Sequence, residues 1–364
     1  MNARPFLWFV VISPLLGSLA ACAGDSTTGP SPPSPQPPAP SATSLIAFSS
    51  LPKDGGADVW LINPDGTGLR RLTNDPRNAS GPVWSPDGST IFFHSARHGF
   101  TEIYSIRLDG SQERRLTYTS RDFGPSCSPD GSKVVFVSER HAEFDLELYM
   151  MNADGTEQVQ LTDTPGDSYA PTWSPDGSRI AFEWLRPLGS EPVETTEIYT
   201  VRPDGSGLVN LTNHPDWDES PDWSPDGSQI AFSAWRDGEI DIYVMNADGS
   251  GLVRLTQGIR RANWPAWSPD GSRIVFTCGW EVGADDICVV NADGSGLSRL
   301  TDNPAADGAP SWSPDGSQIA FHSWQDGSND IWVMDRDGSN LVQLTDTAED
   351  NLGPVWSPRL QAGS

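Results

Sequence analysis

The chain has 364 residues, of which 49 are acidic and 23 are basic, so its formal net charge is −26 at pH 7. Binding to nucleic acid depends on basic surface, so this charge argues against a nucleic acid partner. Much of the excess is Asp in repeated turns, where solubility and turn chemistry are sufficient reasons for it.

The first 22 residues are typical of a secretory signal sequence. Arg4 precedes an apolar run from Phe6 to Leu16, and the Leu-Ala-Ala-Cys sequence that ends at Cys22 is similar to a bacterial lipobox. The run is too short to favour a membrane-spanning helix. We therefore expect Cys22 to be acylated, and Ala23, in place of an aspartate retention signal, indicates the outer membrane. An ordinary cleaved signal, in which Cys22 has no role, is the alternative.

Residues 23–44 form a Pro- and Ser-rich segment, with seven prolines between Pro30 and Pro40. Such a composition cannot bury a core and is expected to form an extended, disordered tether. The folded domain is expected to cover residues 45–359, followed by a short tail at 360–364.

Four short apolar segments recur seven times beyond the tether, at a period of roughly 44 residues. In the clearest copy, residues 221–256, they read P-D-W-S, I-A-F, I-Y-V-M and L-V-R-L-T. The segments are rich in β-branched and aromatic residues, and the S-P-D-G and N-A-D-G-S sequences between them are typical of tight turns. The repeat therefore predicts four-stranded antiparallel sheets, stacked radially as the blades of a β-propeller.

The order of the segments predicts how the fold is closed. The repeat begins with the second, third and fourth segments, from Ile46 to Thr73, and ends with a single first segment, from Pro354 to Ser357. If the first segment is the innermost strand, the C-terminal strand joins the N-terminal three and completes a blade. The sequence thus predicts an all-β, seven-bladed β-propeller whose ring is closed by this joint.

The same strand order separates two faces. The nearly identical turns lie on one face, and the variable connections lie on the other. The variable connections include a long insert at residues 184–196, whereas the equivalent connection at 235–241 is compact. Because loops on a rigid scaffold commonly carry function, the variable face is the candidate binding surface.

Six tryptophans fall in or beside the variable loops of the later blades. They either cap the ends of the cores between blades or form an aromatic patch that binds a protein or a glycan. The six are Trp184, Trp217, Trp235, Trp264, Trp280 and Trp324.

Five aspartates precede the proline of the first segment, near the expected mouth of the central tunnel. We expect them to cap backbone amides, and the alternative is a ring of carboxylates that attracts a divalent cation. The five are Asp122, Asp167, Asp218, Asp307 and Asp350. No dedicated metal site or cofactor is predicted.

Three cysteines lie within the repeats. Cys127 replaces the Trp of one first segment and is expected to be buried as a small apolar residue. Cys278 and Cys288 flank a hairpin connection on neighbouring strands, so they could form a disulfide in an oxidising compartment.

The recurring phrase W-S-P-D-G-S-x-I-A-F, with I-Y-V-M-N-A-D-G-S and L-T, resembles the propeller repeats of the TolB family over nearly all of residues 45–358. The resemblance implies a rigid periplasmic interaction scaffold. TolB proteins add an N-terminal α/β domain to a six-bladed propeller and bind a peptidoglycan-associated lipoprotein. The present chain has neither room for that domain nor the same repeat count, so only the propeller is carried over.

Similar repeats also occur in two groups of enzymes. In prolyl-oligopeptidase-type peptidases they precede a hydrolase domain, but the present chain contains no G-x-S-x-G motif. Oligogalacturonate lyases are seven-bladed propellers that use a His-bound metal. Two of the five histidines here occupy equivalent positions in non-adjacent repeats and are not expected to share a metal; the five are His94, His98, His141, His214 and His322.

Two functional hypotheses follow. The first is a monomeric, non-enzymatic scaffold, lipid-anchored in the outer membrane and facing the periplasm, that binds an envelope protein or glycan through its variable face. The second is a metal-assisted polysaccharide lyase or hydrolase built on the same ring.

Overall fold

The computed structural model describes residues 44–358 except 54, 75–76, 119–120, 143–144, 187–194, 281–284 and 326. All of them belong to one unit of the chain, Pro40–Ser364. Cys22, the predicted signal sequence, all but the end of the tether and the 360–364 tail lie outside the described residues, as does most of the 184–196 insert.

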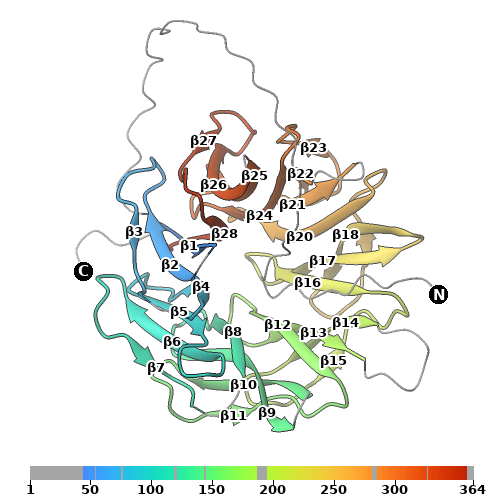
Figure 1. Cartoon of the computed structure of the whole chain (residues 1–364). Coiled ribbons are helices and arrows are strands. Elements are labelled where there is room, and N and C mark those ends of the chain that lie inside the picture. Colours follow the sequence, from blue (N-terminus) through green and yellow to red (C-terminus); the bar gives the residue numbers. More distant parts are fainter. Residues whose placement is uncertain are drawn as a thin grey trace, which may run out of the picture. The chain divides into compact units, whose positions relative to one another are not determined.

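The described residues form strands and no helix, and they contain no helical segment long and apolar enough to cross a membrane. The strands form antiparallel groups of four, which we number along the chain as sheets 1 to 7 (Figure 1). Sheet 1 consists of β28 (Asp350–Trp356), β1 (Ile46–Leu51), β2 (Asp58–Ile62) and β3 (Arg70–Arg71). Sheet 2 consists of β4 (Ala79–Trp84), β5 (Thr90–Ser95), β6 (Glu102–Arg107) and β7 (Arg114–Arg115). Sheet 3 consists of β8 (Asp122–Cys127), β9 (Lys133–Ala142), β10 (Asp145–Asn152) and β11 (Val159–Gln160).

The remaining strands repeat this arrangement. Sheet 4 consists of β12 (Asp167–Trp173), β13 (Ile180–Leu185), β14 (Thr196–Val201) and β15 (Val209–Asn210). Sheet 5 consists of β16 (Asp218–Trp223), β17 (Gln229–Arg236), β18 (Glu239–Asn246) and β19 (Val253–Arg254). Sheet 6 consists of β20 (Arg261–Trp267), β21 (Arg273–Gly279), β22 (Asp286–Asn291) and β23 (Ser298–Arg299). Sheet 7 consists of β24 (Ala306–Trp312), β25 (Gln318–Gln325), β26 (Ser328–Asp335) and β27 (Val342–Gln343). Sheets 5 and 6 are linked by one parallel pair, Ile240↔Arg261.

The prediction of an all-β fold of four-stranded antiparallel sheets is confirmed. The C-terminal strand β28 pairs with β1 in a register that aligns Trp356 with Ile46, so strands from the two ends of the repeat region form one sheet (Figure 1). Ser357 and Leu45 extend this pairing, because the Ser357 amide donates to the Leu45 carbonyl at 2.7 Å.

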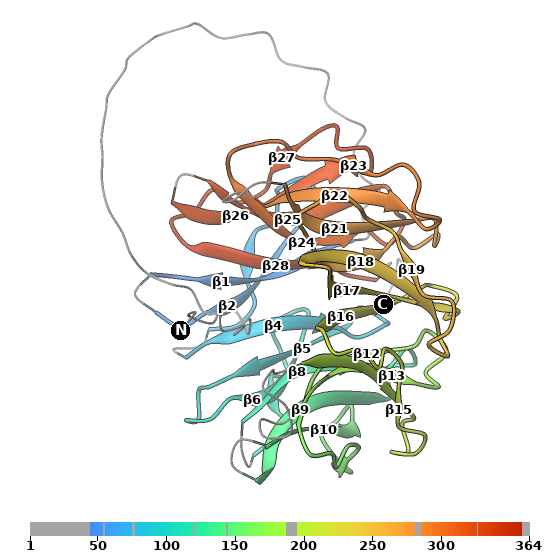
Figure 2. The same cartoon turned by 90° about the vertical axis from the view of Figure 1, so that its right-hand side faces the viewer.

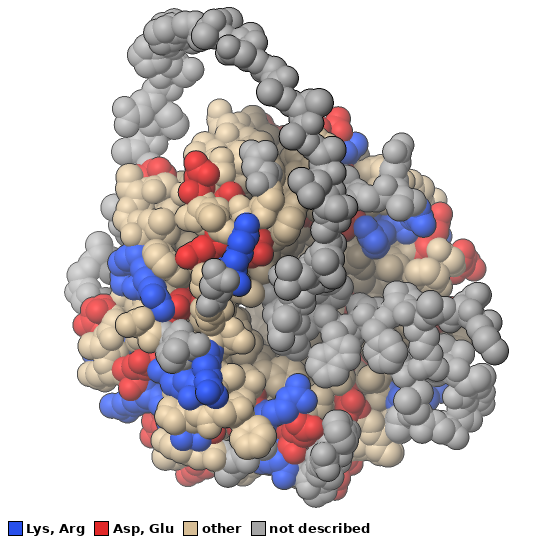
Figure 3. Space-filling model, in the orientation of Figure 1, with Lys and Arg blue, Asp and Glu red and all other residues tan. Residues whose placement is uncertain are grey.

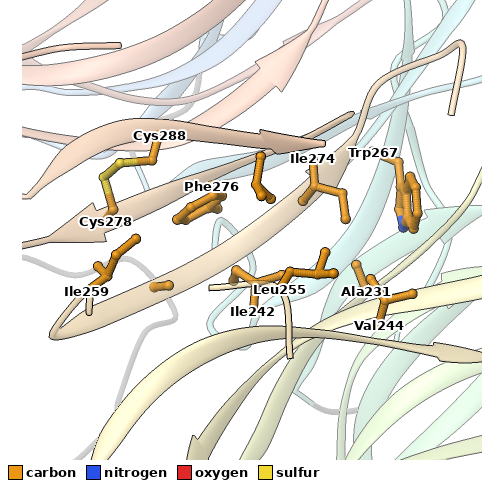
Figure 4. Close-up of a cluster of buried hydrophobic side chains, with 12 residues drawn as sticks. Ala231, Ile242, Val244, Leu255, Ile259, Trp267, Ile274, Phe276, Cys278 and Cys288 are labelled. Atoms are coloured by element: carbon orange, nitrogen blue, oxygen red, sulfur yellow. A yellow bond between two sulfur atoms is a disulfide. The ribbon is translucent and has the colours of Figure 1, made fainter. Parts of the chain in front are cut away.

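The core lies between neighbouring sheets. The second strand of every sheet contributes one fully buried Phe, and both faces of that strand are covered (Figure 2). Between sheets 5 and 6, for example, Ile242 and Val244 of β18 pack with Ile274 and Phe276 of β21 (Figure 4). A lone sheet could not bury two apolar faces, so the repeated I-A-F segment requires stacking against another sheet.

In five of the seven sheets the first strand also forms a polar bond to the preceding sheet. Its Trp side chain donates the indole N–H to the carbonyl of the residue just before the equivalent position in that sheet. The observed bonds are Trp84 to Val355, Trp173 to Ser126, Trp223 to Thr172, Trp312 to Ala266 and Trp356 to Ser311, at 3.1–3.3 Å. At the seam between sheets 5 and 6 the Asp222 carboxylate instead accepts the Trp267 backbone N–H at 2.8 Å.

The tight turns explain much of the repeated Asp. In the turn after β4, Asp87 accepts hydrogen bonds from the Ser85 hydroxyl and the Ser89 amide, and Gly88 has a positive φ of 70°. These hydrogen bonds hold the pKa of Asp87 below its usual range, and the bond from the Ser85 hydroxyl has the largest effect. The same arrangement recurs at Asp130 and Asp226, so the sequence prediction that these residues serve turn formation agrees with their contacts.

Candidate functional site

The connections between the second and third strands, and from each fourth strand to the next sheet, leave the sheets at one end. We call this end the loop face. It includes the β17–β18 connection, the β21–β22 connection and the segments that enter β16 and β24. These connections differ in length and chemistry, whereas the turns at the opposite end repeat.

A buried acidic residue stands at or near the start of the third strand in all seven sheets. None is more than 3% exposed: Asp58, Glu102, Glu147, Glu197, Asp241, Asp286 and Asp330. In sheet 5, the Thr256 hydroxyl donates to Asp241 at 2.7 Å and accepts the Ile242 amide at 3.0 Å. A Thr two residues beyond the fourth strand accepts the equivalent amide in every sheet. This acid–Thr unit fixes the third and fourth strands where they meet the loop face.

In four of the sheets an arginine compensates the negative charge of the buried acid. Arg71, Arg115, Arg254 and Arg299 of the fourth strands form ion pairs with the acids of sheets 1, 2, 5 and 6. Burial nevertheless raises the pKa of Asp241 and Asp286. Sequence reasoning missed this unit, although an acidic residue immediately before the I-Y-V segment in all seven copies is a visible signal.

The five predicted tunnel-mouth carboxylates occupy two different positions on the first strands. Asp122, Asp218 and Asp307 lie three residues before the proline and are at most 2% exposed. Asp122 and Asp218 form ion pairs with Arg140 and Arg236 of their own sheets. Burial is the main cause that raises the pKa of Asp218 to about 6.

Asp167 and Asp350 lie four residues before the proline and accept backbone amides from the preceding sheet. The donors are Leu146 at 3.0 Å and Asn329 at 2.9 Å. These two carboxylates therefore have the amide-capping geometry that the sequence favoured. In the described part of the chain, no group of three or more His, Cys, Asp or Glu side chains is placed to hold a metal ion.

Two glutamates of sheets 4 and 5 interact across the seam between these sheets. Glu183 of β13 accepts the Ser220 amide of β16 at 2.6 Å, and Glu219 lies close enough to act on its charge. Burial and the Glu219 carboxylate raise the pKa of Glu183 to about 8. Burial also raises the pKa of Glu219. Neither carboxylate has a Lys or Arg partner within the described residues, so Glu183 is expected to hold a proton at neutral pH.

The six predicted tryptophans divide into two groups. Trp184 and Trp217 are half-buried: the Trp184 indole donates to Thr164 at 3.1 Å, and the Trp217 ring lies 6.1 Å from that of Trp235. The other four are exposed by 39–47%: Trp235, Trp264, Trp280 and Trp324. The reading that each Trp caps a core therefore fits Trp184 best, and the four exposed rings can contact a partner.

Trp264 stands in an unusual backbone conformation. Its φ is 53°, in the left-handed region that bulky residues rarely adopt. The equivalent residue before the proline has a positive φ in every sheet and is small in the other six: Gly81, Gly124, Ala170, Ser220, Ala309 and Gly353. Its ring lies beside Gly308 of sheet 7, where an added Cβ would be 3.8 Å from the Trp264 ring and in closer contact with His322, at 3.1 Å.

The aromatic residues of sheets 2 and 3 have different surroundings. The Arg97 guanidinium lies 4.5 Å from the Tyr104 ring centre, Arg115 lies 4.6 Å from that of Tyr118, and Arg140 lies 4.6 Å from that of Tyr149. The chain thus stacks its own arginines on tyrosines in these sheets, and in sheet 5 the Arg236 guanidinium lies 5.8 Å from the Tyr243 ring centre.

Cys278 and Cys288 are joined by a disulfide between β21 and β22, and both are fully buried (Figure 4). Cys127 is a free thiol, and burial raises its pKa to about 12. It is half-buried, somewhat less enclosed than the sequence led us to expect.

The histidines whose side chains are described lie apart in the fold. His94 contacts the Ser80 hydroxyl at 2.9 Å, His98 contacts the Tyr104 hydroxyl at 2.6 Å, and His214 lies beside Asp216. Burial lowers the pKa of His94 and of His322 to about 4, so both are neutral at pH 7. On the face shown in Figure 3, basic side chains lie among acidic ones and form no uniform basic field.

The antiparallel four-stranded sheets, joined by first-strand Trp bonds, define a propeller-type repeat protein. Residues 35–146 and 256–362 match the family model of the TolB β-propeller domain, and the chain belongs to this family. Residues 128–253 match the model of the dipeptidyl peptidase IV N-terminal region.

Among curated proteins, a TolB homologue of Chlorobium chlorochromatii is 35% identical over 38% of this chain and 31% of its own length. An uncharacterised protein of Agrobacterium fabrum is 28% identical over 36% of this chain and 48% of its own length. The chain therefore spans less than half of the length of each of these two relatives.

Two solved structures share the fold. TolB from Acinetobacter baumannii has a TM-score of 0.55 at 18% identity, over 86% of this chain and 83% of that chain. An oligogalacturonate lyase in complex with manganese has a TM-score of 0.62 at 17% identity, over 82% and 84%. These similarities concern the fold alone.

Proposed function

We propose that this protein is a non-enzymatic, lipid-anchored scaffold of the cell envelope that binds a protein or glycan through its loop face. The observation that carries the proposal is the set of four exposed tryptophans on sheets 5 to 7. Exposed Trp is costly in water and is enriched at binding hot spots. In contrast, the buried acids beneath these loops bond within the scaffold.

We further propose that the sheets are seven blades of a closed ring. In support, the first strand of each sheet packs on the second strand of the preceding one, including β4 on β1 and β28 on β25. The indole bonds from Trp84 to Val355 and from Trp356 to Ser311 lie at the two seams that flank sheet 1. Closure removes the long sheet edges that would otherwise be open to aggregation.

The anchor and the location rest on the sequence. The lipobox at Cys22 favours acylation, and Ala23 favours the outer membrane with the propeller in the periplasm. Membership of the TolB propeller family supports an envelope role. Metabolic labelling with a fatty acid analogue is expected to label the wild-type chain and not Cys22→Ser; labelling of both would contradict the anchor.

The binding function is tested by capture from an envelope extract. The wild-type chain is expected to retain a defined envelope component, and the triple variant Trp235→Ala, Trp280→Ala, Trp324→Ala is expected to lose it. The control is Phe100→Ala with Tyr118→Ala, which removes two exposed aromatics of sheet 2. Equal capture by all three proteins would refute a role for the Trp-bearing loops.

A second function is favoured by one observation, the fold shared with a manganese-bound oligogalacturonate lyase. The alternative is a metal-assisted polysaccharide lyase or hydrolase. The described residues of this chain do not assemble three metal-ligating side chains, so they do not fit such a centre. Metal analysis of the purified protein, with an assay on acidic oligosaccharides, separates the two functions, because stoichiometric metal with turnover would replace the scaffold by an enzyme.

A further inference from the structure

Resting on the proposed binding function, we propose that the loop face of sheets 5 to 7 recognises a cationic polypeptide, whose Lys and Arg side chains stack on Trp235, Trp280 and Trp324. Trp is the ring that attracts cations most strongly, because its face carries the largest negative electrostatic potential among the aromatic side chains. The partner is therefore defined by basic residues spaced along an extended segment or an exposed loop.

The three rings lie at one end of three consecutive sheets. Trp235 and Trp324 are the sixth residues of equivalent second strands, counted from Ile230 and Ile319, and Trp280 directly follows β21. They are exposed by 39%, 47% and 39%, which leaves a large part of each indole in solvent. The repeat does not require Trp at this position, because the equivalent residues of sheets 1 and 2 are Leu51 and Ala96.

The chain itself shows how such rings are satisfied elsewhere. An internal guanidinium lies over the buried rings of Tyr104, Tyr149 and Tyr243 in sheets 2, 3 and 5, and Arg115 lies over the exposed ring of Tyr118 in sheet 2. Within the described residues no Lys or Arg lies over the ring of Trp235, Trp280 or Trp324. A cationic side chain from a partner would make with these three rings the contact that Arg115 makes with the exposed Tyr118 ring.

The charge of this part of the chain has the matching sign. Residues 161–364 contain 32 acidic and 11 basic residues, whereas residues 44–160 contain 16 and 11. The repeated turn Asp, five in residues 44–160 and eight in residues 161–364, accounts for only three of the sixteen additional acidic residues. On the loop face, Asp237, Asp302 and Asp346 are exposed.

The basic side chains nearby are mostly neutralised. Arg261 pairs with Asp285, and Arg299 pairs with both Asp286 and Asp302, while Arg260 is exposed. An acidic field around apolar rings attracts cationic partners and disfavours anionic ones such as acidic glycans. A neutral glycan could stack on the Trp rings, but the negative electrostatic field would add nothing to its binding affinity.

The test uses the full mature chain and a defined probe, hexa-arginine, with hexa-glutamate and a neutral hexasaccharide for comparison. Binding is followed by titration calorimetry and by Trp fluorescence. We expect hexa-arginine to bind and the other two not to bind, and we expect the affinity to fall between low and physiological salt. The Trp235→Ala, Trp280→Ala, Trp324→Ala variant is expected to lose about 10-fold or more in affinity, since three cation–π contacts are removed.

The control variant Phe100→Ala, Tyr118→Ala should change the affinity less than about 2-fold, because these residues lie on sheet 2. The inference is overturned if hexa-arginine does not bind, if the triple variant binds it as well as the wild type, or if the hexasaccharide binds more tightly. Capture of a non-basic envelope component that depends on the three tryptophans would leave the proposed scaffold function intact and refute only this inference.

Discussion

Sheets 2 and 3 and sheets 5 to 7 arise from the same repeat and differ at their loop ends. Both regions have the buried acid, the Thr that accepts the neighbouring amide and the fully buried Phe. In sheet 2, Arg115 covers the exposed Tyr118 ring, and across sheets 2 and 3 acidic and basic residues are closer to balance. In sheets 5 to 7, tryptophans are exposed within an acidic excess. The structural residues of the repeat are therefore the same in both regions, and the two regions differ at residues that the fold does not require.

The largest expected effect concerns the scaffold that both regions share. Deletion of residues 352–364 removes most of β28, so that β1 is paired fully with β2 alone. It also removes the hydrogen bond of the Trp356 indole. We expect the melting temperature to fall by more than about 10 °C, because several kcal/mol of packing and pairing are lost. Circular dichroism melting of this variant against deletion of 359–364 tests the closed ring, and equal melting curves would show that closure does not stabilise it.

A smaller effect compares the buried acids of the two regions directly. Glu102→Ala in sheet 2 leaves Arg115 and the Tyr104 hydroxyl without this acceptor, and Asp241→Ala in sheet 5 does the same to Arg254 and the Thr256 hydroxyl. We expect each to lower the free energy of unfolding by about 3 kcal/mol, measured by urea denaturation. Values that differ by more than about 1 kcal/mol would show that the scaffold is not equivalent in the two regions.

The pH dependence is expected to come from sheet 4 and its seam with sheet 5. The pKa of Glu183 is raised from 4.5 to about 8, so the folded chain binds this proton more tightly than the unfolded chain does. The corresponding stability is fully present below pH 4.5 and is lost as the pH rises through 8. Glu183→Gln should therefore melt a few degrees above wild type at pH 8.5 and level with it below pH 4.5.

His94 of sheet 2 occupies the position equivalent to Glu183, and its contribution to stability is expected to depend on pH in the opposite direction. Its pKa is lowered from 6.5 to about 4, as is that of His322, so the neutral imidazole is favoured in the fold. Stability from these residues is lost as the pH falls from 6.5 toward 4.

Glu157→Gln, which changes an exposed residue of sheet 3, is the control for the Glu183→Gln variant. An equal response of the two variants to pH would contradict the role of burial.

The smallest expected effect is on stability at the loop face. The Trp235→Ala, Trp280→Ala, Trp324→Ala variant should lower the unfolding free energy by only about 0.5 kcal/mol per residue or less, because none of the three rings belongs to a buried core cluster. The urea midpoint measures this. A loss comparable to that of Asp241→Ala would mean that these rings support the fold, as Trp184 does through Thr164 and Tyr199.

Sequence reasoning located the strands and the turns because period, turn chemistry and apolar content agree in every copy. It found the six tryptophans but grouped exposed Trp324 with half-buried Trp184, although Trp324 is the sixth residue of its I-A-F segment and Trp184 is the fifth. It grouped Asp122 with Asp167, although an offset of one residue relative to the proline separates a buried ion pair from an amide cap. It overlooked the acid–Thr unit, because Asp241 and Thr256 lie 15 residues apart and meet only across two strands.

By itself, the sequence determined the strand content, the tight turns and the repeat, because these depend on local backbone preferences and on short-range hydrogen bonds. The tertiary structure decided which side chains act across seams: Glu183 lies beside Glu219, and Asp222 accepts the Trp267 amide. Burial and the approach of distant strands set these contacts. Both depend on how one sheet packs on the next, and no local pattern in the chain encodes that packing.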